Sequence, residues 1–205
     1  MLSRANVVAG DGGAPPSDVR YPVRRVATGI CLLVVNSEGS ITDLALGIFP
    51  VPYKQTVPRA ELNAPIVLGD LGYTGLLFSD ASYVVKGSQK EATEHWKLIA
   101  SSNGDMWQRY LDHPLIIHKV KAHRTLQCAL RDGDFHAFVA NAFADAAATQ
   151  GVQLYRDRGA EERLDREMKD AKTSFRRVLA IEHARYLSQP KEVPLPDYPP
   201  HSDSS

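Results

Sequence analysis

The sequence is poor in cysteine and has no long apolar run, and each absence excludes a class of protein. Cys31 and Cys128 are its only cysteines, they are far apart, and neither belongs to a CxxC pair. A disulfide-stapled domain is therefore excluded, and with no signal-peptide pattern we expect reduced thiols in a cytoplasmic or nuclear protein. No apolar stretch approaches the roughly 20 residues that cross a bilayer, so we expect no membrane partner.

Net charge is also absent, because 24 basic and 24 acidic residues cancel. A neutral chain has no global field that attracts a polyanion. If nucleic acid is the partner, binding must depend on local basic groups or on metal ions. What the chain does have is a 43% apolar composition, which is enough to bury a domain core.

Hydrophobic patterning predicts strands alternating with helices. Apolar runs bounded by turn residues predict strands at 5–10, 27–36, 41–49, 75–79 and 115–121, the first three antiparallel. We expect the first strand to end in a glycine turn at 11–13. Helical patterns begin near Pro58, Ala81, Asn103 and Phe138, and Pro65 predicts a kink or stop in the first helix. The order predicts an α/β fold, a mixed sheet with helices on its faces.

The C-terminal part differs in kind. An apolar stripe spaced by four and three residues runs through a charged segment at 160–187, formed by Leu164, Met168, Ala171, Phe175 and Val178. This pattern predicts an amphipathic helix that either packs on the domain or pairs with a partner helix or a second copy. Proline-rich 189–205 predicts disorder. We therefore expect a domain at 1–150, a C-terminal helix at 151–188 and a tail at 189–205.

Four carboxylates and a histidine stand where such a scaffold can aim them at one point. They are Asp11, Glu61, Asp80, His123 and Asp145. Asp11 and Asp80 follow apolar runs and would lie side by side if the first and fourth strands are neighbours, while Glu61 and Asp145 reach in from helices. Clustered carboxylates without sulfur suit magnesium, which prefers oxygen ligands. Two Mg²⁺ ions, with Mn²⁺ as the substitute, would support phosphodiester hydrolysis.

Short motifs around these acids resemble the type I ribonuclease H family, including the ribonuclease H domains of retroelements. They are GDGG, RAEL, SDASYVVKG, SNGDMWQRYL, VKAH and NAFADAAA, and the resemblance covers residues 5–148. It implies a ribonuclease H-like five-stranded mixed sheet and an Mg²⁺-dependent endonuclease that cuts the RNA strand of RNA–DNA hybrids. The metal ligands would be Asp11, Glu61, Asp80 and Asp145.

The same resemblance assigns further roles. His123 would lie on a mobile loop and assist water activation or product release, and Asn103 would contact a phosphate. The family's basic protrusion is reduced here to lysines around Trp96, of which Lys86 is a candidate nucleic-acid contact. By family analogy, we expect the unit to derive from a larger retroelement polyprotein.

Two alternatives stay open. A catalytically silent domain of this fold could serve as a nucleic-acid or protein binding module. Integrases, transposases and some exonucleases share both the fold and the two-metal chemistry, so another nucleic-acid substrate is the third reading. The contexts of Glu61, Asp80 and Asp145 fit the ribonuclease H branch better.

Overall fold

The computed structural model describes residues 1–16, 24–121 and 124–188. The chain divides into two compact units, Met1–Glu161 and Glu162–Ser205. The predicted tail at 189–205 and the predicted role of His123 fall outside the described residues. Among the described residues, no helix combines the length and the apolar character that a bilayer span requires.

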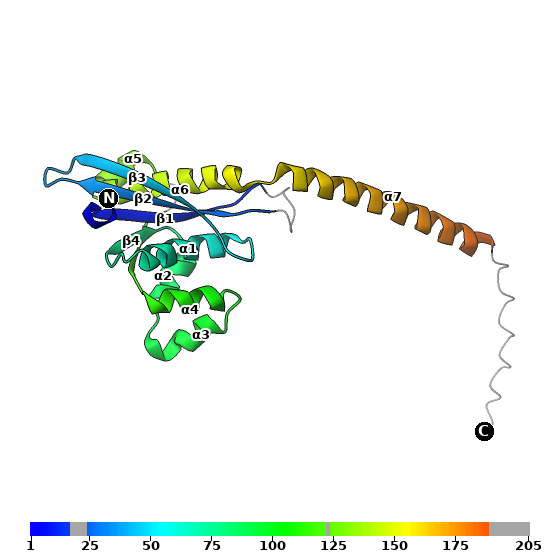
Figure 1. The fold of residues 1–205 in the computed structure, drawn as a ribbon, viewed down its shortest axis with the longest axis horizontal. Helices are drawn as coiled ribbons and strands as arrows, with labels where there is room; N and C mark the ends of the chain where they lie inside the picture. Colours follow the sequence, from blue (N-terminus) through cyan, green and yellow to red (C-terminus); the bar gives the residue numbers. More distant parts are fainter. Residues whose placement is uncertain (17–23, 122–123, 189–205) are drawn as a thin grey trace, which may run out of the picture. The chain divides into compact units, whose positions relative to one another are not determined.

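A five-stranded mixed sheet forms the centre of the first unit, as expected (Figure 1). The strands lie in the order β3-β2-β1-β4-β5. Antiparallel pairing joins the first three, and parallel pairing joins β4 to β1 and β5 to β4. The strand bounds are β1 Val7–Gly13, β2 Ala27–Val35, β3 Ile41–Pro50, β4 Leu76–Ser79 and β5 Ile116–Lys119.

The glycine turn predicted at 11–13 is wrong, because β1 continues through it. Asp11 is paired with Gly29 and Gly13 with Ala27, so β2 supplies backbone partners along the whole segment. The glycines serve close packing instead. A Cβ at Gly10 would lie 2.4 Å from the Cβ of Ala64, and a Cβ at Gly13 would lie 2.7 Å from the backbone of Ala148. Helices can therefore approach both faces of β1 closely.

Helices cover both faces of the sheet (Figure 1). Helix α6 (Phe135–Tyr155) packs on β1 and β2 from one side, and α1 (Val57–Asp70) packs on β1 from the other. The remaining predicted helices are α2 (Ser82–Ser88) and α4 (Gly104–Asp112). The prediction missed four short elements, which are η1 (Leu2–Arg4), η2 (Ala92–Glu94), α3 (His95–Ile99) and α5 (Leu126–Arg131).

Pro65 does not stop α1, contrary to expectation, since the helix continues to Asp70. Proline removes one backbone donor and crowds the preceding turn, which usually ends an exposed helix. Here Pro65 is buried between Ala64 and Ile66, which belong to the main hydrophobic core. Tertiary packing thus holds the helix together across its weakest point.

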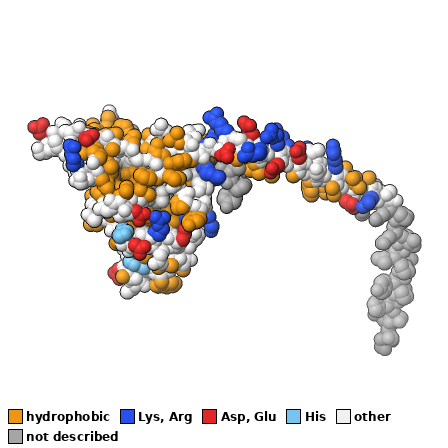
Figure 2. Space-filling model, in the orientation of Figure 1, with side chains coloured by type: hydrophobic (Ala, Val, Ile, Leu, Met, Phe, Trp, Pro, Cys, Tyr) orange, Lys and Arg blue, Asp and Glu red, His pale blue; other side chains and the backbone are white. Residues whose placement is uncertain are grey.

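The second unit consists, among described residues, of most of α7 (Arg158–Ser188). The predicted helix is confirmed, and acidic and basic side chains alternate along it (Figure 2). Phe175 and Val178 of the predicted stripe are exposed. Whether this stripe binds the domain, a partner or a second copy stays a prediction, as do the domain boundaries at 150 and 188.

Candidate active site

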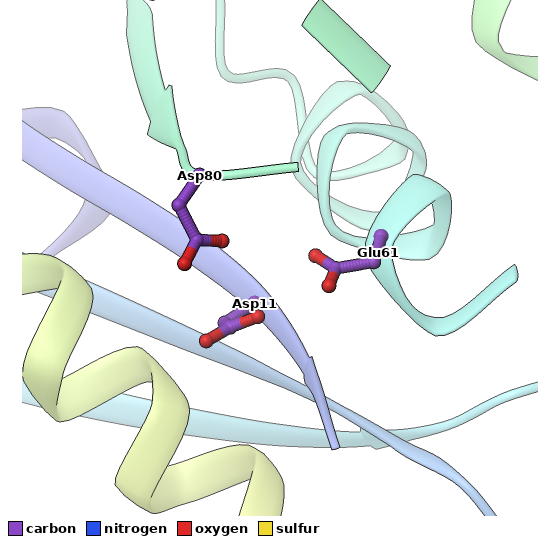
Figure 3. Close-up of side chains that lie close together, drawn as sticks. All are labelled: Asp11, Glu61 and Asp80. Carbon is purple, nitrogen blue, oxygen red and sulfur yellow. The ribbon is translucent and has the colours of Figure 1, made fainter. Parts of the chain in front are cut away.

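Three of the predicted acids converge on one point. Asp11, Glu61 and Asp80 each offer a carboxylate oxygen, and these oxygens lie within 4.8 Å of one another. The side chains come from β1, α1 and the residue that follows β4, and they point toward a common centre (Figure 3). The convergence expected from the sequence is therefore present for these three residues.

The pairing of β1 with β4 brings Asp11 and Asp80 together. Val8 is paired with Leu77 and Ala9 with Phe78 in parallel register, and extending this register by two residues sets Asp11 beside Asp80. Asp80 directly follows the carboxyl end of β4, and Asp11 lies two residues before that of the parallel strand β1, near the edge where open α/β sheets bind ligands. Lys119 Nζ donates a hydrogen bond to the backbone carbonyl of Asp80, which ties this residue to β5.

Glu61 is positioned by polar contacts made by the residues around it on α1. Arg59 is buried and donates two hydrogen bonds to Asp105 at the start of α4, at 2.7 and 2.6 Å. Thr28 Oγ1 donates to the carbonyl of Ala60 at 2.8 Å and accepts from Asn63 Nδ2 at 3.1 Å. Bidentate ion pairs and buried hydrogen bonds of this kind fix the orientation of the helix that carries Glu61. The sequence reasoning missed them, because each joins residues distant in the chain.

Asp145 reaches the same place from α6. It lines a cavity of about 210 Å³ together with Asp11 and Asp80. Its charge also contributes to the rise in the pKa of Asp11. Close packing of α6 on β2 allows this, since a Cβ at Gly29 would lie 2.0 Å from the carbonyl oxygen of Ala144. Asp145 thus lies near Asp11 and Asp80, although it is not within the closest group of three acids.

The cluster cannot hold all its negative charge without a counter-ion. Burial, followed by the charges of Asp11 and Asp80, raises the pKa of Glu61 to about 9. Burial, followed by the charge of Asp80, raises the pKa of Asp11 to about 6. Glu61 therefore carries a proton at neutral pH when no cation is present, and the acids titrate as a coupled set.

The residues fit a divalent metal ion that prefers oxygen ligands. Glu61 Oε2 is buried and lacks a hydrogen-bond partner among the described residues. An orphaned buried oxygen normally marks a missing water or ion. The donor set consists of carboxylate oxygens, which are the ligands that Mg²⁺ and Mn²⁺ prefer.

The predicted nucleic-acid contacts lie on α2 and α4. Asn103 precedes α4, as predicted, but its side chain is buried and donates to Tyr83 Oη at 3.1 Å instead of capping the helix. Trp107 Nε1 donates to the same hydroxyl at 2.6 Å, and Trp107 is fully buried in the core. Tyr83 thus joins α2 to α4, and Lys86, one turn further along α2, is exposed.

Comparison with solved structures identifies the fold. The ribonuclease H domain of prototype foamy virus is 20% identical, and the match covers 72% of this chain and 94% of that chain with a TM-score of 0.53. The protease–reverse transcriptase of prototype foamy virus is 20% identical over 71% of this chain and 20% of that chain, with a TM-score of 0.49. The ribonuclease H1 of Halobacterium salinarum NRC-1 is 17% identical over 71% of this chain and 96% of that chain, with a TM-score of 0.42.

The first of these matches shows that 72% of the chain has the ribonuclease H-like fold. No protein-family model matches the chain, and no curated protein matches it in sequence. The fold and the acidic cluster together define the class, a ribonuclease H-like domain that carries a carboxylate group suited to metal ions.

Proposed function

We propose that this chain is an Mg²⁺-dependent endonuclease that hydrolyses the RNA strand of RNA–DNA hybrids. The observation that carries the proposal is the meeting of Asp11, Glu61 and Asp80 within 4.8 Å. Asp145 lines the cavity together with Asp11 and Asp80. Such a group is costly without a cation, and it stands at the sheet edge where this fold would place a reaction centre.

In this proposal, Asp11, Glu61, Asp80 and Asp145 hold two divalent ions. When bound, the ions would activate a water molecule and stabilise the departing 3′ oxygen. Glu61 must release its proton to become a ligand, and Asp11 must stay ionised. Both requirements follow from the raised pKa values of about 9 and about 6. Mg²⁺ binding should therefore release protons and strengthen as the pH rises.

Three further residues keep the roles that the family resemblance implies. Asn103 and Lys86 would contact the nucleic-acid backbone from neighbouring ends of α4 and α2. His123 would assist water activation or product release. The neutral net charge leaves few long-range attractions, so we expect modest affinity for the hybrid. An origin within a retroelement polyprotein belongs to the same proposal.

The test is cleavage of a labelled RNA–DNA hybrid in Mg²⁺ by the wild-type chain and by Asp80→Asn. This substitution keeps the side-chain shape but removes the ligand charge. We expect it to lower kcat at least about 100-fold, since even outer-shell partners of metal ligands cost 10–100-fold. The matched control is Asp43→Asn, an exposed acid on β3 outside the cluster, which should cleave at the wild-type rate.

Parallel reactions with duplex DNA and duplex RNA separate the alternatives. Preferential cutting of DNA would favour the integrase and exonuclease reading. Hybrid binding without turnover in any divalent metal would favour the silent binding module. Undiminished cleavage by Asp80→Asn would remove the acidic cluster from the mechanism.

A further inference from the structure

The cavity beside the acids has a second, basic wall. Lys121 and Arg124 line it together with Asp11, Asp80 and Asp145. Both cations come from the segment between β5 and α5, Lys121 within the VKAH motif and Arg124 directly after it. A cavity lined by both carboxylates and cations suits an anionic ligand bridged by metal ions.

Arg124 is held in place before any ligand arrives. Its side chain is only 7% exposed, and Nη1 donates to Asp132 at 3.3 Å while Nη2 donates to Asp134 at 2.9 Å. These two acids flank Gly133, whose positive φ of 77° forms the turn between α5 and α6. The guanidinium therefore has little side-chain entropy left to lose when it binds.

Some N–H donors of the Arg124 guanidinium are not used by Asp132 and Asp134. A guanidinium carries five N–H donors in a fixed plane, and the two acids accept only two of them. Its Nε is buried and has no acceptor within the part of the chain that the structure describes. A buried donor without an acceptor costs free energy, which an anionic ligand in the cavity would recover.

Further cations gather around the same turn. The pKa of Asp132 is held below its usual value, first by the hydrogen bond from Arg131 and also by the charges of Lys121 and Arg124. Three cations thus surround one aspartate. Against the two acids of the turn, Asp132 and Asp134, these three cations leave one positive charge uncompensated around the turn.

Charge balance indicates what Arg124 binds. Four carboxylates and two divalent ions would cancel in formal charge, which leaves the phosphate of the substrate uncompensated. Additional negative charge develops on that phosphate as the attacking oxygen approaches. A guanidinium is planar and matches two phosphate oxygens, so it suits this position better than an ammonium does.

We propose that Arg124 binds the substrate phosphate next to the acidic cluster, with Asp132 and Asp134 as its positioning residues. This inference rests on the proposed function, because the phosphate belongs to a nucleic acid bound at the metal site. The competing reading is purely structural, in which Arg124 only fastens the segment before α5 to the α5–α6 turn.

The experiment measures hybrid affinity as a function of salt in Ca²⁺, together with cleavage in Mg²⁺. In Arg124→Gln the side chain keeps a planar polar end group but is shorter and loses its charge. We expect the slope of log affinity against log salt to shrink by about 0.9, the value for one lost phosphate contact. We expect kcat to fall about 100-fold, a loss typical of one transition-state donor. Arg131→Ala is the matched control, since Arg131 also pairs with Asp132, is 74% exposed and does not line the cavity.

Arg124→Lys separates charge from geometry and serves if the glutamine variant does not fold. It should keep the salt slope and still cleave about 10-fold more slowly, because one ammonium cannot match two phosphate oxygens. An unchanged salt slope in Arg124→Gln, or a loss of cleavage that merely follows a loss of thermal stability, would overturn the inference.

The two proposals can fail separately. If the wild-type chain cleaves hybrids while Arg124→Gln keeps the wild-type salt slope and kcat, the inference fails and the proposed function stands. If the wild-type chain binds hybrids without cleaving them and the slope still shrinks in Arg124→Gln, the nuclease activity fails and the phosphate contact stands.

Discussion

At the scale of single residues, the proton on Glu61 links stability to metal binding. The folded protein raises the pKa of Glu61 to about 9 from an ordinary value of 4.5. The folded state therefore holds this proton more tightly than the unfolded chain does. The resulting stability is complete below pH 4.5 and is lost as the pH rises toward 9.

Glu61→Gln should make the metal-free protein more stable at pH 8. Glutamine is neutral at every pH and avoids the buried charge. We expect a gain in unfolding free energy of up to about 5 kcal/mol over the wild type in EDTA at pH 8, and almost none at pH 4, because pH 8 lies 3.5 units above the ordinary pKa of 4.5 and each unit corresponds to about 1.4 kcal/mol. Urea unfolding at the two pH values measures the difference.

Mg²⁺ should reverse the order at pH 8 by stabilising the wild type and not the variant. Glu38→Gln, an exposed acid in the β2–β3 turn, is the control and should behave like the wild type. Equal stability of wild type and Glu61→Gln at pH 8 without metal would show that the acids do not strain one another.

At the scale of elements, contacts between glycines of the strands and alanines of the helices set how closely α6 and α1 approach the sheet. Gly29→Ala would place a Cβ 2.0 Å from Ala144 O and 2.4 Å from Ala148 N, so α6 would have to shift. We expect a loss of about 3 kcal/mol in unfolding free energy, the upper range for overpacking. Cleavage should fall further than stability alone explains, because Asp145 moves with the helix.

Thermal or urea unfolding checks this prediction, and Gly159→Ala in α7 is the control. Gly159 is exposed on a helix, where alanine is the better helix former, so this variant should be neutral or slightly more stable. A Gly29→Ala variant with wild-type stability would mean that α6 and β2 are not closely packed.

Long elements with a clear hydrophobic pattern could be predicted from the sequence, and short elements could not. The strands at 27–36 and 41–49 and the helix at 160–187 follow from periodicity, and β2, β3 and α7 confirm them. Helix α5 has only six residues and was missed, although Thr125 before it caps the helix by accepting from the Cys128 N–H. A helix this short contains too few residues to show a clear hydrophobic periodicity.

Contacts between distant residues also escaped prediction. The pairing of Arg59 with Asp105 and of Arg124 with Asp134 depends on how helices pack, which no local pattern encodes. The acids were found because motif contexts and the expected strand ends placed them together. The proline effect at Pro65 was overestimated, since burial outweighed the lost backbone donor.

At the scale of the whole molecule, the first unit has its own core and carries the acidic cluster. Residues 1–161 contain the sheet, both covering layers and the ion pair between Arg156 and Glu161. A chain ended after Glu161 should therefore fold. We expect its Tm within about 3 °C of the full chain, equivalent to less than about 1 kcal/mol, and an unchanged rate of hybrid cleavage.

Analytical ultracentrifugation of the full chain and of the chain ended after Glu161 tests the role of α7. If the stripe at 160–187 pairs with a second copy, the full chain will associate as its concentration rises and the shortened chain will stay monomeric. A shortened chain that fails to fold, or that folds without activity, would show that α7 contributes to the domain.

The proposed function depends most on whether the four acids share a pair of divalent ions. Anomalous diffraction from crystals soaked in Mn²⁺ tests this directly, since manganese substitutes for magnesium at oxygen sites. We predict two anomalous peaks about 4 Å apart, ligated by Asp11, Glu61, Asp80 and Asp145. No peak at the cluster under saturating Mn²⁺, or Glu61 turned away from every ion, would contradict the proposed metal centre.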